Sequence, residues 1–233
     1  MTPEQQFDRL LAAAPSRPFV TYYDEASGER TELSVKSLAN WVAKTHHLLG
    51  TELGLGVGDT ALVALPAHWI SVPVLLGCLT AGLALTPSGS ADVAFVAPTT
   101  LADAAGAADV YAVAPDSAAA GFGAEPPGQT LDYVTSVRRQ EDKWPTVYLA
   151  AAAADPCLPG LTRGEVAARA AQRDLEPAAR VLTTRAWTSP DDWIDAVLAP
   201  VAAAGSLVIV ANCDDEEVIA KRMSQERATL RLS

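Results

Sequence analysis

Hydrophobic positions recur along the chain with two periods, one typical of helices and one typical of strands. In residues 4–14, Phe7, Leu10 and Ala14 recur at helical spacing. Short β-branched runs such as residues 207–210 are typical of buried strands. The predicted helices are residues 4–14, 34–49, 70–80, 102–107, 131–140, 163–173, 190–204 and 215–226. The predicted strands are residues 19–24, 30–33, 60–65, 81–87, 92–96, 110–113, 146–149, 181–184, 207–210 and 229–233.

Turn and cap residues separate these segments. Residues 25–29 join the first two strands as a hairpin, and Asp214 is positioned to cap the last helix. Residues 117–128 are rich in Gly, Pro and Ala and are predicted to form a loop. The glycines of residues 54–59 precede a strand, whereas a phosphate loop follows one, so a simple turn is predicted there.

Strands and helices alternate over nearly the whole length. This alternation predicts an α/β fold with a mainly parallel sheet and helices on both faces. No composition shift marks a boundary, so residues 1–233 are predicted to form a single domain. At 233 residues the chain can bury a substantial core without disulfides.

Composition and charge exclude several classes of protein. The longest apolar region, residues 70–85, is interrupted by Pro73, Gly77 and Gly82 and is too short to span a bilayer. Lys and Arg number 17 against 28 Asp and Glu, a formal net charge of −11, which repels nucleic acid. We therefore expect neither a membrane nor a nucleic-acid partner.

The expected compartment is the cytoplasm. The first residues contain no basic region followed by an apolar run, so no secretory signal is predicted. The three cysteines, Cys78, Cys157 and Cys213, are scattered, which fits a reducing environment and does not match zinc-ligand spacing. No metal site is predicted.

The candidate chemistry lies in residues 147–164, where a strand meets a helix. A loop that holds phosphates needs glycines, hydroxyl donors and a lysine. Residues 150–160 contain five alanines, no Ser, Thr or Lys, and a glycine only at Gly160. Two interpretations remain: an alanine-rich turn, or a phosphate loop that has lost the groups that bind phosphate.

Four segments resemble motifs of the acyl-adenylate-forming (AMP-binding) enzymes, which include acyl-CoA synthetases, peptide-synthetase adenylation domains and luciferases. Residues 31–39 resemble the family's LTYxEL helix start, and residues 56–66 resemble its GVxxGDxVAxxxP strand. Residues 81–87 are similar to AGAxxxPL, and residues 198–210 to LAPLxxGAxVVL. The resemblance implies the fold of the N-terminal half of that family's large domain.

The sequence departs from this family in the segment that would hold the nucleotide phosphates. Its phosphate loop is rich in Ser, Thr and Gly and ends in Pro-Lys-Gly, whereas here Gly160 stands in the place of the lysine. The degenerate loop positions are Ala150, Ala151, Ala152, Ala153, Ala154, Pro159 and Gly160. The resemblance also implies that the regions for the adenine pocket, the magnesium-binding glutamate and the catalytic lysine lie beyond these 233 residues.

These features predict a truncated, non-catalytic relative that serves as a binding or assembly module, with no catalytic residue and no cofactor. The alternative is a residual acyl-adenylate or acyl-CoA ligase-type protein, or a nucleotide-binding protein, that a partner chain completes. ATP and magnesium are expected only in that alternative. Whether the protein is an enzyme is left open.

Three further expectations follow from the same residues. His46, His47 and His68 lack a nucleophile motif, so surface or core roles are favoured over catalysis. By analogy of fold, a ligand pocket is expected near Tyr148 and Trp187, at the carboxyl ends of neighbouring strands. A homodimer or a protein partner is expected to pair with the last strand at the sheet edge.

Overall fold

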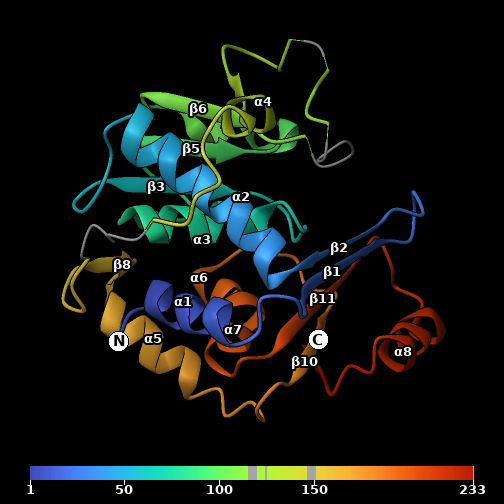
Figure 1. Ribbon diagram of the computed structural model, residues 1–233. Helices are drawn as coiled ribbons and strands as arrows, with labels where there is room; N and C mark the ends of the chain where they lie inside the picture. The colour runs from blue at the N-terminus through green and yellow to red at the C-terminus, as the bar shows by residue number, and fades with distance from the viewer. Residues whose placement is uncertain (115–119, 124, 146–150, 233) are drawn as a thin grey trace. The chain divides into compact units, whose positions relative to one another are not determined.

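The strands form two five-stranded sheets and one two-stranded sheet (Figure 1). The computed structural model describes residues 1–114, 120–123, 125–145 and 151–232, so the strand predicted at 146–149 lies outside the described residues. The helices are α1 (Pro3–Ala13), α2 (Val35–His47), α3 (Ser71–Ala81), α4 (Tyr133–Arg138), α5 (Arg163–Ala171), α6 (Pro190–Trp193), α7 (Ala199–Ala202) and α8 (Glu216–Gln225), with π-helical segments η1 (Leu48–Glu52) and η4 (Ile194–Leu198) and the 3₁₀ helix η2 (Pro98–Ala104). The strands are β1 (Pro18–Asp24), β2 (Arg30–Ser34), β3 (Thr60–Ala64), β4 (Ala84–Thr86), β5 (Val93–Val96), β6 (Asp109–Ala112), β7 (Leu131–Asp132), β8 (Pro156–Leu158), β9 (Leu161–Thr162), β10 (Arg180–Thr183), β11 (Ser206–Ala211) and β12 (Leu230–Leu232).

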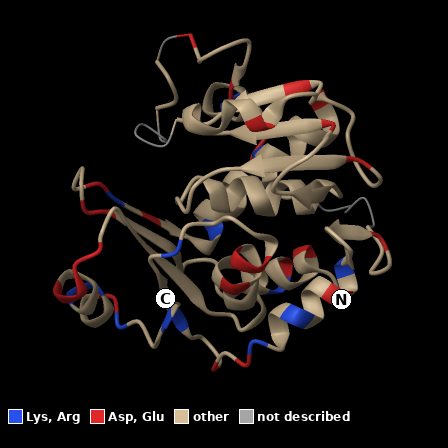
Figure 2. Ribbon diagram, turned by 180° about the vertical axis from the view of Figure 1, so that it is seen from behind, with Lys and Arg blue, Asp and Glu red and all other residues tan. Residues whose placement is uncertain are grey.

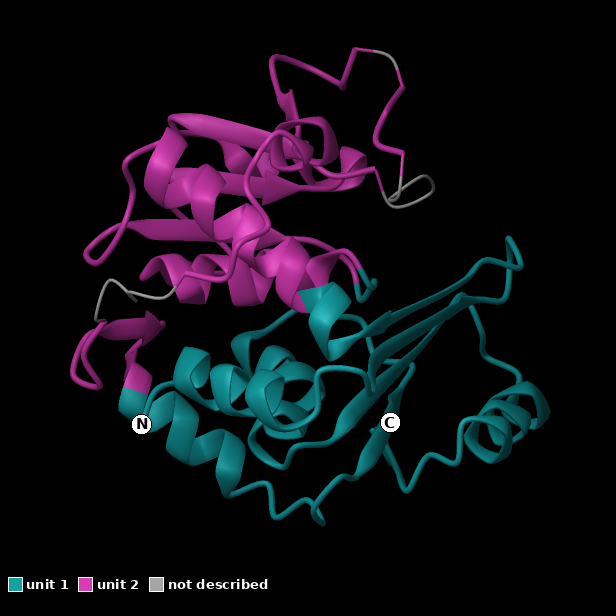
Figure 3. Ribbon diagram, in the orientation of Figure 1, with its two compact units in different colours: residues 1–38, 67–69, 164–233 teal, residues 39–66, 70–163 magenta. Residues whose placement is uncertain are grey.

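The chain divides into two compact units (Figure 3). Unit 1 comprises residues 1–38, 67–69 and 164–233, and unit 2 comprises residues 39–66 and 70–163. The prediction of a single domain over residues 1–233 stays a prediction.

Unit 1 is built on a sheet with the strand order β12-β10-β11-β1-β2, in which only the β1–β2 hairpin is antiparallel. Figure 1 shows α8 on one side of this sheet and α1, α6 and α7 on the other. The register pairs Tyr23 with Val210 and Leu182 with Val208, and these side chains form a core with Ile219 of α8. Both faces of the sheet are therefore covered by helices.

Unit 2 is built on a fully parallel sheet with the order β4-β3-β5-β6-β7. Leu62, Ala94 and Val96 pack on one side with η2. Phe95 contacts Tyr133 of α4, with ring centroids 5.7 Å apart. The Tyr133 hydroxyl lies 2.7 Å from Thr45 Oγ1, which ties α4 to α2.

The predicted fold class is confirmed: the protein is α/β, with mainly parallel sheets and flanking helices. In the described residues the strands divide between two five-stranded sheets and the β8–β9 pair, whereas one sheet was expected. Strand patterns reveal that a segment is extended but not which distant segment it pairs with. Val20 pairs with Leu207, for example, across most of the chain.

Several predicted element boundaries were wrong. The helix predicted at 102–107 is the 3₁₀ helix η2, which begins at Pro98, because proline at the first helical position fixes φ there. The helix predicted at 131–140 begins only after β7, where the Asp132 carboxylate caps α4. The cap of α8 is Asp215, which accepts a hydrogen bond from Glu217 N at 2.9 Å, and not Asp214.

Charge in unit 1 is unevenly distributed. Figure 2 shows Lys and Arg segments on α5 close to the N-terminus, and Asp and Glu segments at the start of α8. Within the described ranges, no helix combines the length and apolarity needed to cross a bilayer.

Candidate functional site

The second half of the alanine-rich loop folds as a hairpin, which was not among the predicted elements. β8 and β9 pair antiparallel, and Pro159 and Gly160 form the turn between them. Gly160 has φ +72°, the left-handed region that glycine adopts without strain. Proline followed by a glycine of positive φ is the typical combination of a type II turn. Gly160 is therefore explained by the turn it makes.

The first half of the loop closes on itself through Asp155. The Asp155 Oδ2 accepts a hydrogen bond from Ala152 N at 2.6 Å, and Asp155 N donates to Ala152 O at 3.0 Å. A backbone N–H that could bind a phosphate oxygen is thus already bound to a carboxylate of this chain. The negative charge of Asp155 also repels a phosphate.

The cation that follows the loop in the sequence, Arg163, is fully buried. Its Nη1 donates to Leu79 O at 3.0 Å and its Nη2 donates to Leu83 O at 2.8 Å, where α3 ends. A guanidinium is stabilised at this position because the last carbonyls of a helix carry partial negative charge. The Arg163 guanidinium is therefore held by hydrogen bonds at the end of α3.

The residues of this loop do not fit a triphosphate. Ala151, Ala152, Ala153 and Ala154 provide no side-chain donor, and Pro159 and Gly160 form a turn. Ala150 and Tyr148 lie outside the described residues. Each hydrogen bond to a charged phosphate oxygen contributes roughly 1.5–3 kcal/mol, and the side chains of these alanines, the proline and the glycine can supply none.

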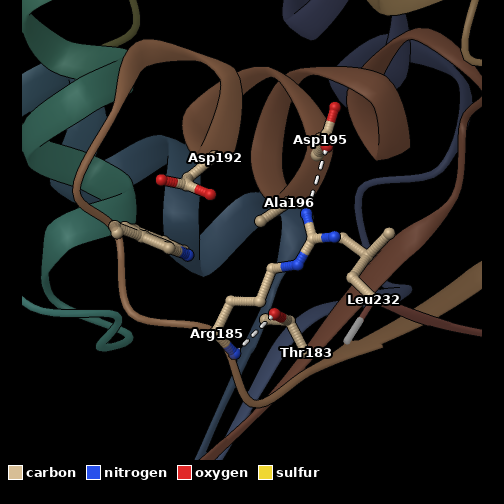
Figure 4. Close-up of a pocket in the computed structure, with 7 residues that line it drawn as sticks. Thr183, Arg185, Asp192, Asp195, Ala196 and Leu232 are labelled. Atoms are coloured by element: carbon tan, nitrogen blue, oxygen red, sulfur yellow. Dashed lines mark hydrogen bonds and ion pairs between the residues drawn. The ribbon is translucent and has the colours of Figure 1, made fainter.

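A small pocket lies in unit 1 at the carboxyl ends of two parallel strands (Figure 4). Thr183 ends β10 and Leu232 ends β12, and both line the pocket together with Trp187. Figure 4 shows Asp192, Asp195 and Ala196 on the helical segment above them. The carboxyl ends of parallel strands are where α/β proteins bind ligands.

The charged side chains of this pocket are held by ion pairs and hydrogen bonds. Arg185 Nη1 lies 3.4 Å from Asp195 Oδ2, and Arg173 Nε forms an ion pair with Asp195 Oδ1 at 2.6 Å. Asp192 Oδ2 accepts from the Ser189 backbone N at 2.9 Å and from its hydroxyl at 2.8 Å, which starts the helix. These side chains therefore hold the pocket walls in place.

Trp187 contributes an unsatisfied donor to this pocket. Its indole is 7% exposed, and its Nε1 is buried without a hydrogen-bond partner in the described part of the chain. The lining residues leave essentially no room for a water molecule between them, whereas ligand pockets commonly measure roughly 300–1,000 Å³. The space is too small for an acyl chain or an adenylate.

The sequence prediction therefore placed Trp187 beside a pocket, and ligand binding there stays a prediction. Arg185 and Asp195 were missed. A usable signal existed for Arg185, because it stands just past a predicted strand, where α/β sheets place functional side chains.

His46 and His68 are buried, whereas His47 is half-buried and lies 3.0 Å from Lys143 O. His68 is 2% exposed, and its ring lies 4.2 Å from the Tyr22 ring between centroids. Burial lowers the pKa of His68 to about 4 and also lowers the pKa of His46. Among the described side chains, no group of three or more His, Cys, Asp or Glu residues is placed to hold a metal ion.

Three solved structures share the fold of this chain. An acyl-CoA synthetase of Brucella canis superposes with a TM-score of 0.80 at 15% identity, covering 99% of this chain and 47% of that one. The anthranilate CoA ligase AuaEII, solved with anthranoyl-AMP, gives a TM-score of 0.76 at 11% identity, covering 99% and 49%. The N-terminal domain of FACL13 from Mycobacterium tuberculosis gives 0.71 at 13%, covering 99% and 62%.

The class of protein is thus defined by its fold: this is the fold of the N-terminal subdomain of acyl-CoA synthetases, as the motifs predicted. The chain spans about half the length of the first two of these structures. Sequence similarity gives the narrower assignment. The chain is 39% identical over 234 residues to a TIGR03089 family protein of Mycobacterium tuberculosis (strain ATCC 25618 / H37Rv), covering 95% of this chain and 94% of the relative, and it belongs to that family. No protein-family model matches the chain.

Proposed function

We propose that this protein is a non-catalytic relative of the AMP-binding enzymes that acts in the cytoplasm as a binding or assembly module. The observation that carries the proposal is the closed loop at residues 152–155. There the Asp155 carboxylate accepts the Ala152 N–H at 2.6 Å, and no hydroxyl or lysine of residues 150–160 is available to a phosphate. The protein therefore requires neither ATP nor magnesium.

Calorimetry with ATP and magnesium, together with a pyrophosphate-exchange assay, tests this proposal. We expect no heat of binding up to millimolar ATP and no exchange above background, with an active acyl-CoA synthetase as the positive control. Micromolar ATP binding or measurable exchange would overturn the proposal.

The variant Asp155→Asn separates two causes of weak binding. It removes the negative charge but restores no lysine or hydroxyl, so we expect it to bind ATP no better than the native chain. If the variant binds ATP with submillimolar affinity, the carboxylate alone blocks the site, and the loop still has the groups that bind phosphate. Circular dichroism of both proteins checks that the fold is unchanged.

The assembly part of the proposal concerns β12. This strand is at the edge of its sheet and pairs with β10, and Leu230 on it is 38% exposed. An open strand edge with apolar side chains favours pairing with another chain. We therefore propose that a second copy or a partner protein pairs with β12.

Light scattering over a concentration series measures this association. Leu230→Lys should abolish it, because a lysine on an edge strand opposes pairing. Leu131→Lys is the matched control, since Leu131 is 49% exposed on β7 at the edge of the other five-stranded sheet. A monomer at high concentration, or equal effects of the two variants, contradicts the assignment of the interface to β12.

The alternative function is a residual ligase-type or nucleotide-binding protein completed by a partner chain. The observation that favours it is that the chain covers 47% and 49% of two solved synthetase structures, so another chain could supply the rest. Exchange activity that appears only after a co-expressed partner is added would support this alternative.

A further inference from the structure

A larger cavity than the Trp187 pocket lies elsewhere in unit 1. It measures about 350 Å³ and is bounded by α1, the end of α5 and the end of α7. Leu10 and Val201, each 2% exposed, form its apolar wall with Ala202. Its volume falls at the lower end of the roughly 300–1,000 Å³ that small-molecule sites occupy.

This cavity is separate from the candidate site described above. Ala204, which lines it, stands just before β11 (Ser206–Ala211), so the cavity lies toward the amino ends of the parallel strands. Thr183 and Leu232 line the Trp187 pocket at the carboxyl ends. The residues that line the cavity on α1 and α7 belong to neither the alanine-rich loop nor that pocket.

Two arginines give the cavity a positive charge. Arg9 contributes a charged side chain to the lining, which also includes the N-terminal residue Met1. Arg9 makes no hydrogen bond or ion pair with any residue that the structure describes. Arg17 Nη2 donates to Ala204 O at 2.8 Å, which places a second guanidinium beside the lining. A chain with a formal net charge of −11 therefore offers donors for an anion here.

Gln6 adds an acceptor that lacks a donor. Its Nε2 donates to Ala167 O at 3.3 Å, while its Oε1 is buried without a partner in the described residues. Gln6 and Arg9 are three positions apart on α1, so their side chains are neighbours on one helix face. A ligand that carries an anionic acceptor next to a donor would satisfy both side chains.

We propose that this cavity binds a small carboxylic acid with an apolar chain and a hydroxyl group next to the carboxylate. The carboxylate accepts hydrogen bonds from Arg9. The hydroxyl donates to Gln6 Oε1 when the Gln6 amide rotates toward the cavity, because this oxygen is fully buried in the structure described. The apolar chain packs against Leu10, Val201 and Ala202. Nothing in this proposal depends on the alanine-rich loop, so it stands or falls separately from the proposed function.

Calorimetry with 2-hydroxyoctanoate, octanoate and the neutral 1,2-octanediol tests the proposal. We expect saturable one-to-one binding of 2-hydroxyoctanoate, about tenfold tighter than that of octanoate, because an unpaired buried acceptor costs about as much as a tenfold change in affinity. The absence of saturable 2-hydroxyoctanoate binding at millimolar concentration would overturn the proposal.

Matched variants assign the two contacts. Arg9→Gln should weaken the binding of both carboxylates about tenfold or more and leave the binding of 1,2-octanediol unchanged. Arg169→Gln is the control, because Arg169 is exposed on α5 outside the lining, and it should leave the binding of all three ligands unchanged. Gln6→Leu should remove the preference for 2-hydroxyoctanoate over octanoate. Retention of that preference, or equal binding by Arg9→Gln, contradicts the assignment.

A filling variant locates the apolar chain. Ala171 lines the cavity from an exposed position at the end of α5, so Ala171→Phe should block binding while the protein still folds. Ala168→Phe is the control, because Ala168 is exposed on the same helix and is not among the lining residues. Binding that survives Ala171→Phe would place the ligand elsewhere.

Discussion

The buried imidazole of His68 should make the stability of this protein depend on pH. Burial lowers the pKa of His68 to about 4, because the charged form loses its hydration in the core. In the unfolded chain a histidine titrates near about 6.5. Between these two values the unfolded state binds the proton more readily, so stability falls as the pH falls.

The magnitude follows from the two pKa values. A pKa difference of one unit corresponds to about 1.4 kcal/mol, so lowering the pKa from about 6.5 to about 4 corresponds to about 3 kcal/mol. This contribution is fully present above about pH 6.5 and is lost as the pH falls to about 4. The net stability of a domain is only about 5–15 kcal/mol, so the loss should be readily measured.

The assay is urea unfolding of the native chain and of His68→Phe at several pH values from 7 to 4. Phenylalanine keeps an aromatic ring against Tyr22, which lies 4.2 Å away between centroids, and it cannot be protonated. The native free energy of unfolding should fall by about 3 kcal/mol more than that of the variant over this range. A residual slope is expected from His46, whose pKa is also lowered by burial.

Parallel pH profiles for the native chain and His68→Phe would refute this reasoning. A constant offset between them would mean that the variant changes packing alone. Titration of the His68 ring by NMR gives an independent check, since a pKa above about 6 would contradict its burial in neutral form.

Three further predictions concern backbone and packing. Gly77→Ala should destabilise by about 1–3 kcal/mol in thermal unfolding, because a Cβ there would lie 2.4 Å from the Cβ of Thr45; unchanged stability would show that α2 and α3 can separate. Gly160→Ala should cost about 1–2 kcal/mol from backbone strain alone, since φ is +72° and no atom lies within 4 Å of the added Cβ. Asp215→Ala should lower the free energy of unfolding by about 1 kcal/mol and Asp214→Ala by clearly less, because Asp215 accepts the Glu217 N–H at 2.9 Å; the reverse order would restore the original assignment of the cap.

The hairpin at Gly160 was foreseeable from the sequence, although the alanine-rich run concealed it. Residues 158–161 read Leu-Pro-Gly-Leu, and a Pro-Gly pair between apolar residues indicates a tight turn. The resemblance of this segment to a phosphate loop emphasises the missing lysine. Its local turn chemistry was an equally strong signal.

The sequence by itself determined the α/β class, most of the helices and strands, and the resemblance to the AMP-binding enzymes. These features depend on local periodicity and on short motifs, which act over a few residues. Only the tertiary structure decided that the strands divide between two five-stranded sheets and that Arg163 is buried at the end of α3. It also placed Trp187 and Leu232 around one pocket. It placed Gln6 and Arg9 around a second cavity, together with Val201. Such pairings join residues far apart in the chain, and their energy comes from packing that no local pattern specifies.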